Sequence, residues 1–346
     1  MYKMDKILRT AVKYQASDVY FATGAKPTIR INGDLIQIEE HPILTKQTAE
    51  EYIYEIMTAE QKKFFEQNLE LDYALEIEDI SRFRVNVFMQ RKGISATMRL
   101  ISENVMSIEE LNLPSQLKKA TQFKNGLVII TGPAGSGKTT SLAAMINEIN
   151  RTQKKHILTI EDPIEYVHRD EKCLIQQREV GTSTQSFHRA LRSALREAPD
   201  IILLGEMRDL ESMKQAITAA ETGHLVFATL HTSGCANSIN RIIDSFPSEE
   251  QNQVRTQLAM TLRAVFFQSL IKTKDKKGRV GAFEIMFNNS AVANMIRKAT
   301  THQINSVIET SAKEGMQTMK KAVTDLFQAG IITEEDALEN IPKEFE

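Results

Sequence analysis

The chain has 346 residues, of which 42% are hydrophobic and 25% charged, and this composition predicts one large or two ordinary globular domains. The 43 Lys and Arg residues are balanced by 45 Asp and Glu residues, and the net charge of -2 provides no global basic field for holding nucleic acid. Cys173 and Cys235 are the two cysteines, which excludes a disulfide framework and a four-cysteine zinc site. The apolar runs are too short to predict a signal peptide or a membrane span, so we expect a cytoplasmic chain.

Residues 1–100 predict an α+β domain. Residues 17–37 alternate apolar and polar side chains around turn-forming glycine and proline, which predicts a β-meander. A polar helical stretch over residues 48–70 follows, and two strand-like runs come next, SRFRVNVFMQ and GISATMRLI. Residues 101–124 contain a proline and few strand signals, so we expect them to form a connector between two bodies.

Residues 125–346 predict an α/β domain. Short apolar strands alternate here with longer helical runs, and the strands are GLVIIT, HILTI, DIILLG and HLVFATL. Fully apolar strands separated by helices predict a parallel sheet that is covered on both faces. An S-x-x-Q pattern at Ser248 predicts a capping box that opens a long helix reaching about Ile271. The remaining residues predict helices, apart from the strand-like run RVGAFEIMF.

The strongest functional signal is the run GPAGSGKT, which matches the P-loop pattern G-x-x-x-x-G-K-[ST] between a predicted strand and a predicted helix. The alternative is a chance glycine-rich turn, but such a turn would not require a strand before it and a helix after it. Glycines let backbone N–H groups face phosphates, Lys138 is expected to bridge the β- and γ-phosphates, and the Thr139 hydroxyl to bind Mg²⁺. The expected ATP-binding residues are Gly132, Pro133, Ala134, Gly135, Ser136, Gly137, Lys138, Thr139 and Thr140.

Hydrolysis also needs carboxylates near the phosphates, and two glutamates follow predicted parallel strands. Glu161 ends the run HILTIE, and Glu206 follows IILLG. Gly205 stands where many P-loop enzymes carry a Mg²⁺-binding aspartate, so Glu206 would hold the metal through its own side chain or through a water. His231 follows the strand LVFATL, where it could sense the γ-phosphate. The alternatives are a helix cap or solvated loop for each glutamate and a bond to a loop carbonyl for the histidine.

Arginines form two groups in the sequence. One group surrounds RALRSALR and LLGEMRD, where Arg192 and Arg196 would share one helix face, and the other comes from the two strands that end the first domain. An arginine delivered from a neighbouring subunit stabilises transition-state charge in many P-loop rings, and a solvated surface is the alternative for any single one. The two groups are Arg189, Arg192, Arg196 and Arg208, and Arg82, Arg84 and Arg99.

Four segments resemble, in order, the Walker A, Asp box, Walker B and His box motifs of the bacterial secretion ATPases: GPAGSGKTT, TIEDPIEYVH, LRSALREAPDIILLGEMRD and ETGHLVFATLHT. The match covers the chain nearly end to end. Its length, the run QREV and the run ALRSALRE resemble the branch that retracts type IV pili. This resemblance implies a PAS-like amino-terminal domain, a RecA-like ATPase domain and a homohexamer in which each ATP lies between subunits.

The resemblance also implies roles for single residues. Glu161 would activate the attacking water, Glu206 would be the Walker B acid, and His231 would couple hydrolysis to motion. The arginines that fall at the family's nucleotide-facing positions are Arg84, Arg99, Arg192, Arg196 and Arg208. The implied partners are an inner-membrane pilus platform protein and, indirectly, pilin, with the motor peripheral at the inner membrane. Residues 291–298, AVANMIRK, depart from the family motif AIRNLIRE at its first arginine and final glutamate.

Several functions remain open at this point. The first is a hexameric ATPase motor that powers pilus retraction and twitching motility, and the second is an accessory retraction ATPase or a related secretion ATPase. A nucleic-acid translocase is a third, because RecA-like rings also move DNA, but the near-neutral charge disfavours it. A small-molecule kinase is a fourth, and it would not need arginines from two domains.

Overall fold

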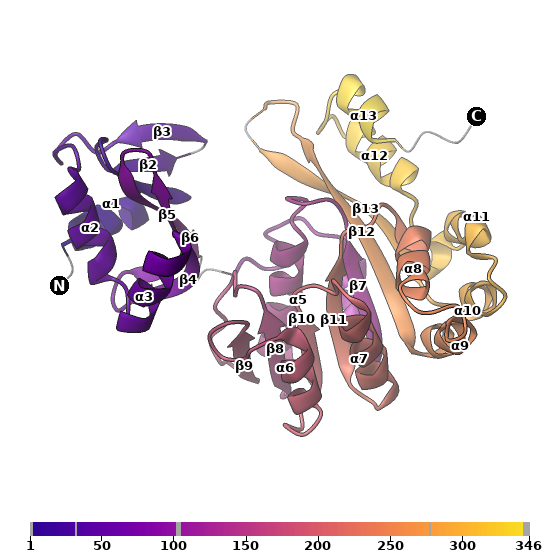
Figure 1. Ribbon diagram of the computed structural model, residues 1–346. Coiled ribbons are helices and arrows are strands. Elements are labelled where there is room, and N and C mark those ends of the chain that lie inside the picture. The colour runs from indigo at the N-terminus through magenta and orange to yellow at the C-terminus, as the bar shows by residue number, and fades with distance from the viewer. Residues whose placement is uncertain (1–2, 32, 102–104, 277, 342–346) are drawn as a thin grey trace. The chain divides into compact units, whose positions relative to one another are not determined.

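The computed structural model describes residues 3–31, 33–101, 105–276 and 278–341, and it divides into two compact units (Figure 1). The first unit consists of residues Met1–Asn104 with Glu165–Val167. The second consists of Val105–Ile164 with His168–Glu346. Each unit has its own buried hydrophobic cluster.

The first unit is a six-stranded antiparallel sheet in the order β3-β2-β1-β6-β5-β4 with three helices. Alternate residues of the strands, among them Phe21, Phe83 and Met98, are fully buried in its core. The predicted β-meander and the two later strands are confirmed. The elements are α1 (Asp5–Lys13), β1 (Asp18–Ala22), β2 (Thr28–Ile31), β3 (Asp34–Gln37), α2 (Lys46–Glu55), α3 (Ala59–Asn68), β4 (Glu70–Ile77), β5 (Ser81–Gln90) and β6 (Gly93–Ile101).

The predicted helical stretch over residues 48–70 is two helices rather than one. Helix α2 ends at Glu55, and Thr58 then starts α3 with a capping box, in which its hydroxyl accepts from the Gln61 N–H and the Gln61 side chain accepts from the Thr58 N–H. Strand β4 begins at Glu70, directly after α3, and was not predicted, although its run ELDYALEI places apolar residues at alternate positions.

The second unit begins earlier than the sequence predicts. Residues 101–124 were expected to form a connector, but Ile108, Leu117 and Ala120 are buried in the core of the second unit. The last two belong to the short helix α4 (Ser115–Ala120). Residues 102–104 lie outside the described part of the chain.

The second unit is built on a seven-stranded sheet in the order β13-β12-β7-β11-β10-β8-β9. All neighbouring pairs are parallel except β12 and β13, which form an antiparallel pair. The predicted parallel α/β sheet is confirmed. The strands are β7 (Gly126–Thr131), β8 (His156–Glu161), β9 (Leu174–Glu179), β10 (Ile201–Leu204), β11 (Leu225–Leu230), β12 (Leu262–Lys272) and β13 (Arg279–Phe287).

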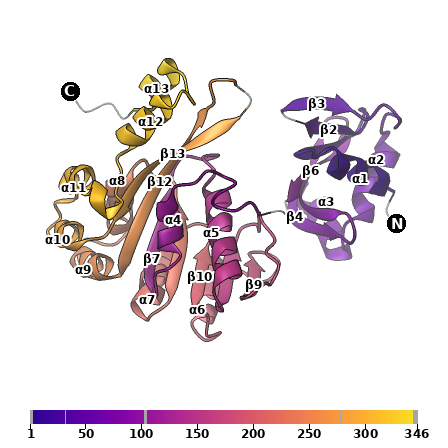
Figure 2. The same ribbon diagram turned by 180° about the vertical axis from the view of Figure 1, so that it is seen from behind.

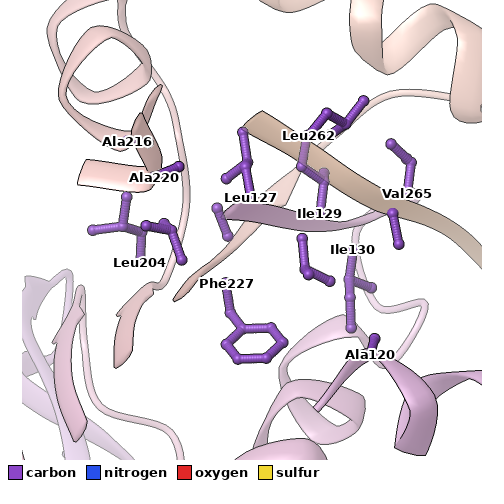
Figure 3. Packing of buried hydrophobic residues seen from close by; sticks show 14 of the residues in the cluster. Ala120, Leu127, Ile129, Ile130, Leu204, Ala216, Ala220, Phe227, Leu262 and Val265 are labelled. Atoms are coloured by element: carbon purple, nitrogen blue, oxygen red, sulfur yellow. The ribbon is translucent and has the colours of Figure 1, made fainter. Parts of the chain in front are cut away.

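Helices cover both faces of this sheet. Helices α6 and α7 lie on the face seen in Figure 1, and α4 and α5 lie on the opposite face, seen in Figure 2. Side chains of β7, β11 and β12 pack together between these layers (Figure 3). The helices of this unit after α4 are α5 (Lys138–Thr152), α6 (Phe187–Ala194), α7 (Leu210–Glu221), α8 (Cys235–Asp244), α9 (Gln251–Thr261), α10 (Ser290–Arg297), α11 (Ile304–Thr310), α12 (Met319–Gln328) and α13 (Glu334–Asn340).

The predicted long helix reaching Ile271 is wrong. Helix α9 ends at Thr261, and the next eleven residues form β12, which lies between β7 and β13 in the sheet. The capping box is also wrong, because Glu250 is the N-cap of α9 and makes no side-chain capping bond. Within the described ranges, none of the helices is both long and apolar enough to cross a lipid bilayer.

Candidate functional site

The P-loop joins β7 to α5 at the carboxyl edge of the parallel sheet. Gly132, Gly135 and Gly137 all have positive φ angles, of 150°, 73° and 85°. Residues with a Cβ rarely adopt these backbone conformations. Gly137 is the N-cap of α5, and the helix begins at Lys138. This is the strand, glycine-rich loop and helix that the motif predicts.

The side chain of Lys138 folds back over the loop. It is 7% exposed, and its ammonium donates to the carbonyl oxygens of Gly132 at 2.8 Å and Pro133 at 2.9 Å. The ammonium also lies 3.4 Å from Nδ1 of His231, which follows β11. The lysine therefore spans the mouth of the loop and contacts the neighbouring strand end.

A chain of polar contacts continues from His231 along the strand ends. Nε2 of His231 lies 3.3 Å from Oε1 of Glu206, which follows β10. Arg208 donates to Oε2 of Glu206 at 2.7 Å and to Oδ2 of Asp162 at 3.2 Å. The sequence-predicted residues Lys138, His231, Glu206 and Arg208 are thus brought together in one continuous network.

The partners of His231 fix its tautomer. A lysine ammonium is a donor only, so Nδ1 of His231 must accept the contact from Lys138. With Nδ1 as the acceptor, the ring proton lies on Nε2, which faces Oε1 of Glu206 at a distance of 3.3 Å. Arg208 supplies the positive partner of Glu206. The same ion pairs raise the pKa of the Arg208 guanidinium above its usual value.

Glu161 ends β8 and is 7% exposed. Its Oε1 accepts from the Thr159 hydroxyl at 2.7 Å and from the Gln177 amide at 3.2 Å. Strands β8 and β9 are paired in register so that Thr159 faces Gln177, and all three side chains lie on one face of the sheet. The carboxylate is therefore held in place at the carboxyl edge, where the P-loop also begins.

The loop has polar groups that fit a nucleotide and its metal. Oγ of Ser136 is buried and has no hydrogen-bond partner among the described residues. A buried hydroxyl in this state costs free energy until a ligand satisfies it, and a phosphate oxygen is such a ligand. The half-buried Thr139 is the second residue of α5, so its hydroxyl is placed at the helix start for an octahedral metal with oxygen ligands.

The arginines of the α6 region do not join this network. Arg192 lies on α6, but the helix ends at Ala194, so the prediction that Arg192 and Arg196 share a helix face is wrong. Further along, Pro199 disfavours the helical conformation at Ala198, which has a positive φ of 51°, so the helix could not have continued past this point in any case. Both arginine side chains are exposed and have neither an ion pair nor a hydrogen bond within the part of the chain that the structure describes.

Arg84 and Arg99 belong to the first unit and face each other across β5 and β6. They continue a cross-strand row with Asp18 of β1 and Arg30 of β2. Arg99 donates to Oδ1 of Asp18 at 3.0 Å, yet its side chain is 67% exposed. One polar sheet face therefore presents several guanidinium groups.

Two residues that support the site were not predicted. Gln268 of β12 accepts from the Ser141 hydroxyl at 2.8 Å, and its backbone oxygen lies against Gly132. Gln177 of β9 contacts Glu161. Gln268 was missed because its strand was predicted as a helix. Gln177 lies in the run QREV. It was missed because only the order of strands in the sheet places this run beside the end of β8.

The chain is similar to known proteins along nearly its whole length. The protein family described as Type II/IV secretion system protein matches residues 2–339. The chain is 47% identical to the type IV pilus retraction ATPase PilT of Pseudomonas aeruginosa PAO1 over 98% of this chain and 99% of that protein. It is 41% identical to the type IV pilus ATPase PilU of the same strain, over 97% and 88%.

A solved structure is also similar. The crystal structure of the pilus retraction motor PilT with bound ADP superposes with a TM-score of 0.92, at 40% identity, over 99% of this chain and 98% of that chain. The α/β fold with a P-loop is thus shared along the whole length. This chain belongs to the Type II/IV secretion system protein family, and it is an ATP hydrolase of that family.

Proposed function

We propose that this chain is the subunit of a homohexameric motor that hydrolyses ATP to retract type IV pili. The observation that carries the proposal is the network at the strand ends, in which the P-loop lysine is linked through His231 to Glu206 and Arg208. Similarity to a retraction ATPase over nearly the full length of both chains supports retraction of the pilus and not its extension. The first unit is then the PAS-like domain, and the second is the RecA-like ATPase domain.

Nucleotide binds where the P-loop meets α5. The ammonium of Lys138 exchanges the carbonyls of Gly132 and Pro133 for phosphate oxygens, and Ser136 gains its missing partner. The Thr139 hydroxyl and Glu206 would hold Mg²⁺, Glu206 directly or through a water. When bound, Mg²⁺ neutralises charge on the β- and γ-phosphates.

Glu161 accepts the proton of the attacking water. Its carboxylate is fixed on one oxygen by Thr159 and Gln177, so it does not have to reorganise during the reaction. His231 reports the state of the γ-phosphate to Glu206, because it contacts both Lys138 and Glu206. These contacts support the coupling role that the resemblance implies for His231.

The arginines act between subunits. Arg192 and Arg196 are exposed with side chains free of partners within the described residues, and Arg84 and Arg99 stand on a polar sheet face, so all four are accessible to a neighbouring copy. A guanidinium delivered to the phosphates of an adjacent subunit stabilises charge in the transition state. Arg208 differs, because it is already paired within its own chain with Glu206 and Asp162.

The partners of the motor are an inner-membrane platform protein and, through it, pilin. Residues 291–298 contain most of α10, which buries Val292 and Ile296 and exposes Ala291, Asn294 and Arg297. We assign the exposed face of α10 to the platform protein, which places the motor in the cytoplasm at the inner membrane. Charge reversal of Arg297 should then leave ATPase activity unchanged and abolish twitching.

The test is a deletion strain complemented with wild-type or Lys138→Ala protein. We expect the deletion to give many surface pili and no twitching, with rescue by the wild type alone. Loss of surface pili would indicate an extension motor. Normal retraction that fails only against load would favour an accessory role, for which the similarity to PilU is the supporting observation. DNA-stimulated, salt-sensitive ATPase activity would favour a translocase.

A further inference from the structure

We propose that Gln177 is a positioning residue that sets the catalytic geometry of Glu161, an inference that rests on the base role proposed above. Gln177 lies on β9, the edge strand next to β8. Its two amide atoms make two different bonds. Nε2 donates to Oε1 of Glu161 at 3.2 Å, and Oε1 accepts from the backbone N–H of His168 at 2.8 Å.

These partners fix which way the amide points. A flipped amide would place its oxygen against the carboxylate of Glu161 and its NH₂ group against the N–H of His168, and both contacts would be repulsive. Gln177 therefore has one orientation in which both bonds form. In that orientation it delivers a donor to the carboxylate and an acceptor to the backbone.

The two bonds connect opposite ends of one loop. Glu161 ends β8, and His168 closes the following segment, which runs through the cis peptide bond between Asp162 and Pro163. Gln177 thus ties the start of this segment to its end. A second residue of β9, Glu179, accepts from the N–H of Ile164 at 3.0 Å and anchors the middle of the segment.

The donor side of Gln177 is the part that bears on catalysis. Thr159 and Gln177 both donate to Oε1 of Glu161, and their directions differ because one comes from β8 and the other from β9. Two donors from different strands hold Oε1 along two directions and so constrain the plane of the carboxylate, and loss of one donor weakens this constraint. A general base must face the water along its lone pairs, so loss of the second donor lowers the rate of the chemical step more than the affinity for nucleotide.

Two variants separate positioning from loop anchoring. Gln177→Met keeps the length of the side chain and removes both bonds. Gln177→Glu keeps the shape and the acceptor for His168, but replaces the donor with a carboxylate that repels Glu161. If Gln177 only anchored the loop, Gln177→Met would lower the melting temperature and the nucleotide affinity together with the rate. If it positions Glu161, both variants lower the hydrolysis rate while the melting temperature and the nucleotide affinity stay near those of the wild type.

The matched control is Gln176, the preceding residue of the same strand. It is exposed, and its Oε1 contacts Nε2 of His156 at 2.9 Å, away from Glu161. Gln176→Met and Gln176→Glu therefore apply the same chemical changes at a neighbouring position that faces the other side of the sheet. They should leave hydrolysis unchanged.

The experiment measures single-turnover hydrolysis of ATP by the full-length assembled protein, and the affinity for a fluorescent ATP analogue. We expect both Gln177 variants to lower the hydrolysis rate about 10- to 100-fold, with nucleotide affinity within about threefold of the wild type and an unchanged melting temperature of the nucleotide-bound protein. A wild-type rate for Gln177→Met, or for Gln177→Glu, would overturn the inference.

Glu161→Gln in the same assay keeps the two proposals apart. If Glu161→Gln abolishes hydrolysis and the Gln177 variants do not change it, the base role stands and the positioning role fails. If Glu161→Gln hydrolyses ATP at a rate near that of the wild type, the proposed base role fails, and the inference about Gln177 fails with it.

Discussion

Gly132 is a fixed glycine of the P-loop motif and Gly135 stands at one of its variable positions, and the structure turns this difference into a quantitative prediction. Both have a positive φ, so an alanine at either position strains the backbone. A Cβ on Gly135 would meet nothing within 4 Å, whereas a Cβ on Gly132 would lie 2.2 Å from the backbone oxygen of Gln268 and 2.8 Å from Oγ of Ser136. Gly132→Ala must therefore displace a neighbour.

Displacing the neighbouring backbone of Gln268 costs free energy. Gln268 belongs to β12, which is hydrogen-bonded to β7 on one side and to β13 on the other. Backbone strain in the left-handed region costs about 1–2 kcal/mol, and both variants bear this cost. Forcing extra volume into a packed site adds about 1–3 kcal/mol, and only Gly132→Ala bears this second cost. We expect Gly132→Ala to be less stable than Gly135→Ala by about 1–3 kcal/mol.

The assay is thermal unfolding of the nucleotide-free protein, because nucleotide would stabilise the variants unequally. For a unit of this size the expected difference in the midpoint of unfolding is about 2–12 °C. Because the clash is with a backbone atom, a second substitution of Gln268→Ala should not rescue Gly132→Ala. Equal unfolding midpoints for the two glycine variants, or rescue by Gln268→Ala, would refute the reasoning.

Three further predictions follow from the site and the core. Glu161→Gln and Glu206→Gln should still bind an ATP analogue but lose turnover, and loss of binding in both would assign them a structural role instead. Specific ATPase activity should rise with protein concentration, because an isolated subunit lacks the arginines of its neighbour, and full activity at high dilution would contradict this. Burial raises the pKa of the Cys235 thiol, so iodoacetamide at pH 8 should modify Cys235 only after denaturation, as mass spectrometry of the native and unfolded protein would show.

The parts of the site that could be predicted from sequence are those set by local signals. The P-loop is one continuous run with a strand before it and a helix after it, so Lys138 and its glycines were placed correctly. Glu206 and His231 were found because each directly follows a short apolar strand, and parallel strands end at the same edge of a sheet. The sequence did not predict their contacts with each other.

What could not be predicted depends on which strands are neighbours. The run LRAVFFQSLIK follows a helix and is almost continuously apolar, so its periodicity does not separate a buried strand from a buried helix. Its pairing with β7, far away in the sequence, decides that it is a strand. Gln268 reaches the P-loop only through that pairing, and Gln177 reaches Glu161 only because β9 adds to the edge of the sheet beside β8. The end of α6 was different, because the dipeptide Ala198-Pro199 was a visible signal that the helix stops.

The contacts of Lys138 explain how nucleotide binding can change the contacts of residues outside the P-loop. The ammonium of Lys138 donates to the carbonyls of Gly132 and Pro133 and contacts Nδ1 of His231. Phosphate oxygens that bind this ammonium compete with these contacts. A change at a carbonyl affects only the loop, but a change at His231 affects an imidazole whose other nitrogen lies 3.3 Å from Glu206, which in turn holds Arg208 and, through it, Asp162. Because Asp162 follows Glu161 directly, the same lysine that binds phosphate is connected to the segment that carries the proposed base.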